Sequence, residues 1–84
     1  MNIDDYADEA GLELLRLEPR DQFDPCIVGI VERFNQTYVL YDKEKVLEAL
    51  QADGLSEEDA MEHFGFNIAG AWVGDATPGF LIVP

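Results

Sequence analysis

The hydrophobic and polar pattern is clearest in the middle of the chain, where it predicts a strand followed by a helix. Residues 37–41 (TYVLY) consist of strand-forming types throughout. The next run, KEKVLEALQA, has apolar positions at helical spacing, and Asp42 directly before it is a typical N-cap. Asp53 and Gly54 are expected to end this helix. The residues expected to be buried on its inner face are Val46, Leu47 and Leu50.

A second helix is predicted to begin after Ser56, because Ser56 is a strong N-cap and Asp59 has capping-box spacing from it. Apolar residues then recur at helical spacing to about Val73, so the helix is expected to stop at Gly74. After a turn, residues 80–83 (FLIV) are expected to form a last strand beside residues 37–41. Three small residues that would lie inside this helix, and would allow close approach of another element, are Gly65, Ala69 and Gly70.

The pattern before residue 36 is consistent with more than one structure. Residues 23–35 (FDPCIVGIVERFN) are rich in β-branched types, but Asp24 followed by Pro25 is typical of a helix start. The apolar residues also recur at helical spacing, and we favour a short helix over a strand. Gly11 favours a break, and the segment after it, residues 12–18, could be an edge strand or a short helix. We favour the strand, and expect residues 19–22 to form a loop.

These elements predict one domain of residues 1–84 in the α+β class, with helices on one face of a sheet. We expect a short antiparallel sheet of about two to four strands packed by two or three helices. Within the domain, an acidic N-terminal segment (residues 1–22) precedes the main part of the fold.

Net charge limits the possible binding partners more than any motif does. The chain of 84 residues has 18 Asp and Glu against 5 Lys and Arg, which gives a net charge of −13. DNA, RNA and anionic membranes are therefore poor ligands, whereas a basic protein surface is the natural complement. The alternative is an ordinary solvated acidic face. The candidate partner-binding residues fall in two clusters: Asp4, Asp5, Asp8 and Glu9, and then Asp53, Glu57, Glu58, Asp59 and Glu62.

Candidate catalytic chemistry is weak. The Gly-rich stretch FNIAGAWVGDATPGF lacks the Lys that a phosphate loop requires after its last Gly. Cys26 and His63 are each the only residue of their type, and nothing in the sequence brings them together as a dyad. Cys26 lies in an apolar run typical of a buried, inert thiol. We therefore expect no catalytic activity, no cofactor and no bound metal, and a monomer or homodimer in the cytoplasm.

Residues 24–83 contain several longer motifs: E-R-F at 32–34, Y-D-x-x-K-V-x-E at 41–48, D-G at 53–54, F-N at 66–67, G-A-W-V-G at 70–74 and T-P-x-F at 77–80. In these motifs the chain resembles a family of small acidic proteins encoded by bacteriophages, which implies a location in the cytoplasm of a bacterial host. Leu55 and Asp59 depart from the family pattern, which has Met and Glu there. Residues 1–23 take no part in the resemblance.

The chain is most similar to anti-CRISPR proteins that inhibit the type I-C surveillance complex, Cascade. This resemblance implies a protein that binds the complex and blocks its access to target DNA. The two acidic clusters would then imitate the phosphates of nucleic acid in a groove lined by Lys and Arg. A second reading is a phage accessory protein that binds another basic nucleic-acid-binding protein, and the least favoured is a small hydrolase that uses Cys26 or His63.

Overall fold

The computed structural model describes residues 3–12, 14–34, 36–68 and 77–84, and the predicted helix end at Gly74 lies outside these residues. Along the described chain, α1 (Ile3–Ala10) and α2 (Arg20–Phe23) precede a single 3₁₀ turn, η1 (Asp24–Cys26). The hairpin of β1 (Ile27–Arg33) and β2 (Gln36–Asp42) follows. The chain continues through α3 (Lys43–Ala52), α4 (Glu57–His63), the π-helical turn η2 (Phe64–Ile68) and β3 (Gly79–Leu81).

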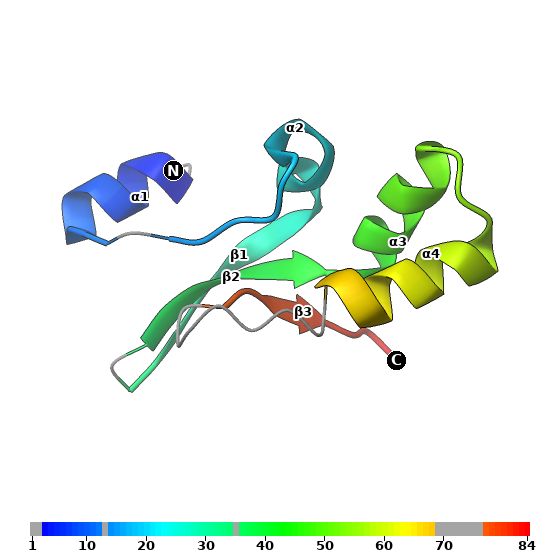
Figure 1. Ribbon diagram of the computed structural model, residues 1–84. Helices are drawn as coiled ribbons and strands as arrows, with labels where there is room; N and C mark the ends of the chain where they lie inside the picture. The colour runs from blue at the N-terminus through cyan, green and yellow to red at the C-terminus, as the bar shows by residue number, and fades with distance from the viewer. Residues whose placement is uncertain (1–2, 13, 35, 69–76) are drawn as a thin grey trace.

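The described strands form a three-stranded sheet in the order β1-β2-β3 (Figure 1). Strands β1 and β2 are antiparallel, with a bulge at Val28 because the register shifts between Ile27 and Gly29. β3 runs parallel to β2 and pairs Phe80 with Tyr41. The α+β class is thus confirmed, but the sheet is mixed. A parallel pair requires a long crossover between its strands, and α3 and α4 lie within that crossover.

Capping signals placed the two central helices correctly. The Asp42 carboxylate accepts a hydrogen bond from the Lys45 backbone N–H at 3.2 Å, and the Ser56 hydroxyl accepts one from the Asp59 N–H at 3.1 Å. Helix α3 ends at Ala52, and Gly54 takes the left-handed conformation (φ 107°) that favours glycine. The second predicted helix is confirmed as α4 and continues into η2, while its predicted part from residue 69 onward lies outside the described residues.

Three predictions before residue 36 are wrong. The predicted helix over residues 24–34 is limited to the turn Asp24–Cys26, and the β-branched run after it forms β1 because β2 pairs with its backbone. Residues 14–18 do not form a strand: the Leu17 N–H donates to the Tyr41 hydroxyl at 2.8 Å instead of to a neighbouring strand. The expected loop over 19–22 contains the short helix α2.

The core lies where β2, α3 and α4 meet. Val39, Tyr41 and Val46 are fully buried, and Cys26 is buried beside them, as the sequence predicted for this thiol. The buried set also contains Phe23, Leu47, Leu50, Ala60 and Phe64.

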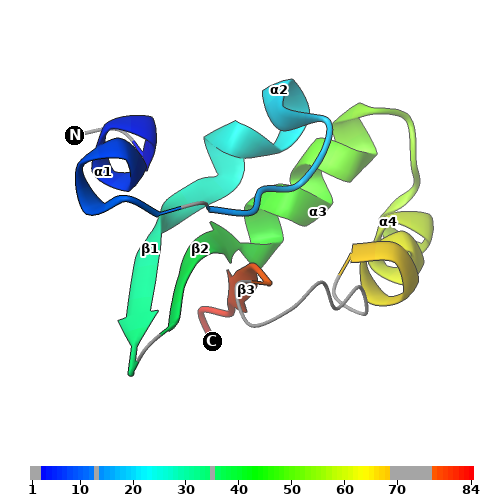
Figure 2. The same cartoon turned by 60° about the vertical axis from the view of Figure 1, so that its left-hand side comes forward.

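The molecule is elongated, with extents of 39 × 24 × 22 Å. Helix α1 lies at one end, whereas α3 and α4 pack together at the other (Figures 1 and 2). The two ends therefore present separate surfaces to a partner.

Candidate protein-binding surfaces

Asp53, the C-cap of α3, belongs to a predicted acidic cluster whose other four residues lie on helix α4. The inner face of α4 is fixed by Ala60 and by Phe64 in the next turn, which are both buried in the core. The remaining positions must therefore face water, and every carboxylate of the cluster is exposed. We call this cluster the α4 acidic surface; it consists of Asp53, Glu57, Glu58, Asp59 and Glu62.

The α4 acidic surface forms no ion pair with the described residues of the chain. Within the described ranges, none of its five carboxylates lies within 4.0 Å of a Lys, Arg or His nitrogen. Glu58 and Glu62 lie one helical turn apart, as do Glu44 and Glu48 on α3, and each like-charged pair costs about 0.2–0.5 kcal/mol. Favourable interaction of first-turn acids with the helix dipole offsets part of that cost.

The N-terminal cluster has a different environment. Asp4, Asp5, Asp8 and Glu9 lie on α1, at the far end of the molecule from α4 (Figure 1). Asp4 pairs with Arg16 and lies 3.8 Å from Arg20, so its charge is partly offset within the chain although its side chain is 69% exposed. The nine predicted partner-binding residues therefore form two groups and not one continuous surface.

An ion-pair network that the sequence did not indicate ties α1 to the rest of the chain. The Arg16 side chain is only 11% exposed and bonds Asp24 at 3.2 Å as well as Asp4. Arg20 lies 3.6 Å from Asp24, one helical turn away. Two of the five cations in the chain are thus committed to internal pairs. Arg16 and Asp4 are twelve positions apart, and no local pattern signals such a contact.

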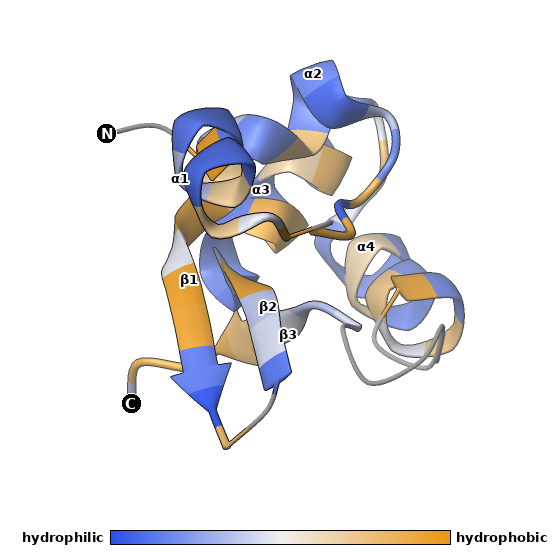
Figure 3. Ribbon diagram, turned by 90° about the vertical axis from the view of Figure 1, so that its left-hand side faces the viewer, coloured by the Kyte–Doolittle hydropathy of each residue, from blue (hydrophilic) through white to orange (hydrophobic). Residues whose placement is uncertain are grey.

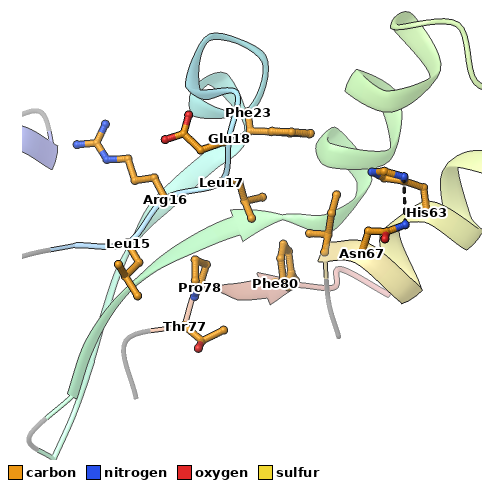
Figure 4. A pocket seen from close by; sticks show the side chains of 11 residues that line it. Leu15, Arg16, Leu17, Glu18, Phe23, His63, Asn67, Thr77, Pro78 and Phe80 are labelled. Carbon is orange, nitrogen blue, oxygen red and sulfur yellow. Dashed lines mark hydrogen bonds between the residues drawn. The ribbon is translucent and has the colours of Figure 1, made fainter. Parts of the chain in front are cut away.

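A cavity of about 370 Å³ separates the N-terminal segment from α4 and β3 (Figure 4). Its walls include the apolar side chains of Leu17, Phe23 and Phe80, while Arg16 points away toward α1 (Figure 4). At one edge, the His63 Nδ1 and Asn67 Nδ2 atoms lie 3.4 Å apart. The volume is typical of small-molecule sites.

A Cys26–His63 dyad, which the sequence does not indicate, finds no support in the side-chain environments either. Cys26 is buried and does not line the cavity at whose edge His63 lies. Burial raises the pKa of the Cys26 thiol above its ordinary value of 9.0, although Lys45 acts in the opposite direction. A reactive cysteine requires a lowered pKa, so these surroundings favour a structural role for Cys26.

Among the described residues, no group of three or more His, Cys, Asp and Glu side chains could hold a metal ion. No helix in the same part of the chain has the length and apolar character needed to cross a bilayer.

The chain was also compared with known proteins. Comparisons with protein-family models, with curated proteins and with solved structures found no match to it.

Proposed function

We propose that this protein is a non-catalytic anti-CRISPR inhibitor that binds the type I-C surveillance complex and blocks its access to target DNA. The supporting observation is the α4 acidic surface, whose five carboxylates are exposed and form no ion pair within the described part of the chain. The choice of target rests on the resemblance of residues 24–83 to the phage family. The negative charge of the α4 acidic surface requires a partner that presents a basic surface.

The arrangement of charges suits a groove that binds phosphates. Carboxylates one turn apart on a helix are separated by about 6 Å along its axis, so Glu58 and Glu62 present a row of negative charge. A groove lined by Lys and Arg holds phosphate groups by charge and hydrogen bonding, and carboxylates accept the same bonds. Long-range attraction would also raise the association rate.

The test is a binding measurement between the purified surveillance complex and this protein over increasing NaCl concentration. The double variant Glu58→Lys/Glu62→Lys reverses two charges on the α4 acidic surface. We expect it to weaken binding by at least about thirty-fold, which corresponds to roughly 2 kcal/mol. Target DNA should compete with the wild-type protein for the complex, because both would occupy one groove.

The matched control is Asp21→Lys/Glu32→Lys, which changes the net charge equally at exposed positions on α2 and β1. We expect this control to lower the association rate and leave the dissociation rate nearly unchanged. Equal weakening by both double variants would show a nonspecific charge effect. Absence of binding to the complex, together with capture of another nucleic-acid-binding protein, would favour the accessory-protein reading.

A further inference from the structure

A second surface combines apolar and acidic side chains in one groove. The groove has a volume of about 480 Å³ and lies between α3, α4 and the segment after β3. On its apolar side, Met61 is 56% exposed, Ile82 66% and Val83 74%. Figure 3 shows the chain next to the C-terminus as a hydrophobic stretch. Large apolar side chains gathered at one exposed site are typical of a binding surface.

Carboxylates surround this apolar patch. Asp42, Glu44 and Glu57 line the groove together with a single cation, Lys43, among the described residues. The Lys43 ammonium lies 5.4 Å from the centre of the Phe64 ring, which belongs to the buried core. With one ammonium against three carboxylates in its lining, the groove is predominantly negative.

The apolar patch and the negative charge around it together determine which kind of molecule fits the groove. A second copy of this chain would bring another net charge of −13, and nucleic acids and anionic membranes would be repelled in the same way. A protein segment with an apolar side chain between Lys or Arg residues complements the groove in both respects. The apolar side chain would cover Ile82 and Val83, and the cations would meet Asp42, Glu44 and Glu57.

We propose that the groove binds such a basic segment of the partner protein through an aliphatic anchor. The basic character of the segment rests on the proposed function. The aliphatic anchor adds a contact that charge alone does not provide. The acidic residues would accelerate association, whereas burial of the anchor would slow dissociation. Binding would then discriminate between basic segments that carry an anchor and those that do not.

Two synthetic peptides test this without the surveillance complex. One has a central pair of leucines flanked by three lysines on each side, and the other has serines in place of the leucines. We expect the leucine peptide to bind about ten-fold more tightly to the wild-type protein, and Ile82→Asp to abolish the difference. The matched control is Phe34→Asp, which makes the same chemical change at the hairpin tip, where Phe34 is 95% exposed.

The outcomes separate this inference from the proposed function. Equal affinity for the two peptides, or a preference that survives Ile82→Asp, would overturn the groove assignment. A dimer in light scattering that Ile82→Asp dissociates would also overturn it, because a second copy would be the occupant. Loss of surveillance-complex binding in Glu58→Lys/Glu62→Lys would still support the proposed function in either case, since neither residue lines the groove.

Discussion

At the scale of single residues, Phe34 occupies an unfavourable position. It has a positive φ of 53° and is 95% exposed, so the strained backbone is not offset by burial of the ring. A left-handed conformation costs a non-glycine residue about 1–2 kcal/mol, and Asn tolerates it better. We expect Phe34→Asn to raise the free energy of unfolding by about 1 kcal/mol in urea denaturation. Phe34→Val should lower the free energy of unfolding. If both variants were more stable than wild type, removal of the exposed ring would explain the gain better than relief of the positive φ.

Tyr41 connects stability to pH. It is fully buried, and its hydroxyl accepts the Leu17 N–H, so Tyr41→Phe leaves that donor unpaired and should cost about 1–2 kcal/mol at pH 7. Burial also raises the pKa of Tyr41 above its ordinary value of 10.0. Above about pH 10 the unfolded chain therefore loses this proton before the folded chain does, and the folded state loses stability.

The stability difference between wild type and Tyr41→Phe should consequently shrink as pH rises through 10, because only the wild type has this phenol to ionise. Cys26 has a raised pKa as well and destabilises both proteins in the same direction from about pH 9. Urea midpoints at pH 7, 9 and 10.5 would measure the effect. A difference that stays constant would show that Tyr41 ionises with the same pKa in both states.

At the scale of elements, the join between β2 and β3 depends on Gly79. A Cβ atom at this position would lie 2.9 Å from Cε2 of the Tyr38 ring, closer than real Cβ contacts occur. Gly79→Ala should therefore lower the free energy of unfolding by about 1–3 kcal/mol, as expected for overpacking. The matched control is Gly65→Ala in η2, where a Cβ meets nothing within 4 Å. This control should be neutral or stabilising by up to about 1 kcal/mol, and an equal loss in both variants would exclude the steric explanation.

Elements with local signals could be predicted from the sequence, and those that depend on distant contacts could not. Asp42 and Ser56 cap their helices through bonds to residues three positions away, so the signal and its cause are close together. The β-branched run of β1 fits both helical spacing and strand propensity; it consists of Ile27, Val28, Ile30 and Val31. Only its pairing with β2 makes it a strand and not a helix. The irregular course of residues 14–18 depends on the bond from Leu17 to Tyr41, which are 24 positions apart.

The same difference between local signals and distant contacts applies to the candidate surfaces. The exposure of Glu57, Glu58 and Glu62 was predictable, because helical periodicity turns Ala60 and Phe64 inward. The pairing of Asp4 with Arg16 could not be predicted from the sequence. The groove in which Ile82 lies close to α3 and α4 could not be predicted either. Both arise where chain segments meet in space, and neither leaves a pattern in the sequence.

At the scale of the whole molecule, the net charge of −13 acts on folding and on binding in opposite senses. In about 10 mM salt the screening length is roughly 30 Å, so a molecule 39 Å long feels repulsion between nearly all of its carboxylates. In about 150 mM salt that length falls to roughly 8 Å, and mainly neighbouring charges still interact. Salt should therefore stabilise the fold while it weakens attraction to a basic partner.

We expect the melting temperature to rise, and affinity for the surveillance complex to fall, between these two NaCl concentrations. Calorimetry and a binding titration on one protein sample would measure both trends. In Glu58→Gln/Glu62→Gln both slopes should be smaller, since these residues contribute to self-repulsion and, on our proposal, to binding. If the substitutions reduced the slope for stability but left the slope for binding unchanged, the carboxylates of α4 would repel one another without meeting the partner. The binding charge would then lie elsewhere, and α1, with its four acidic residues at the other end of the molecule, would be the surface to test next.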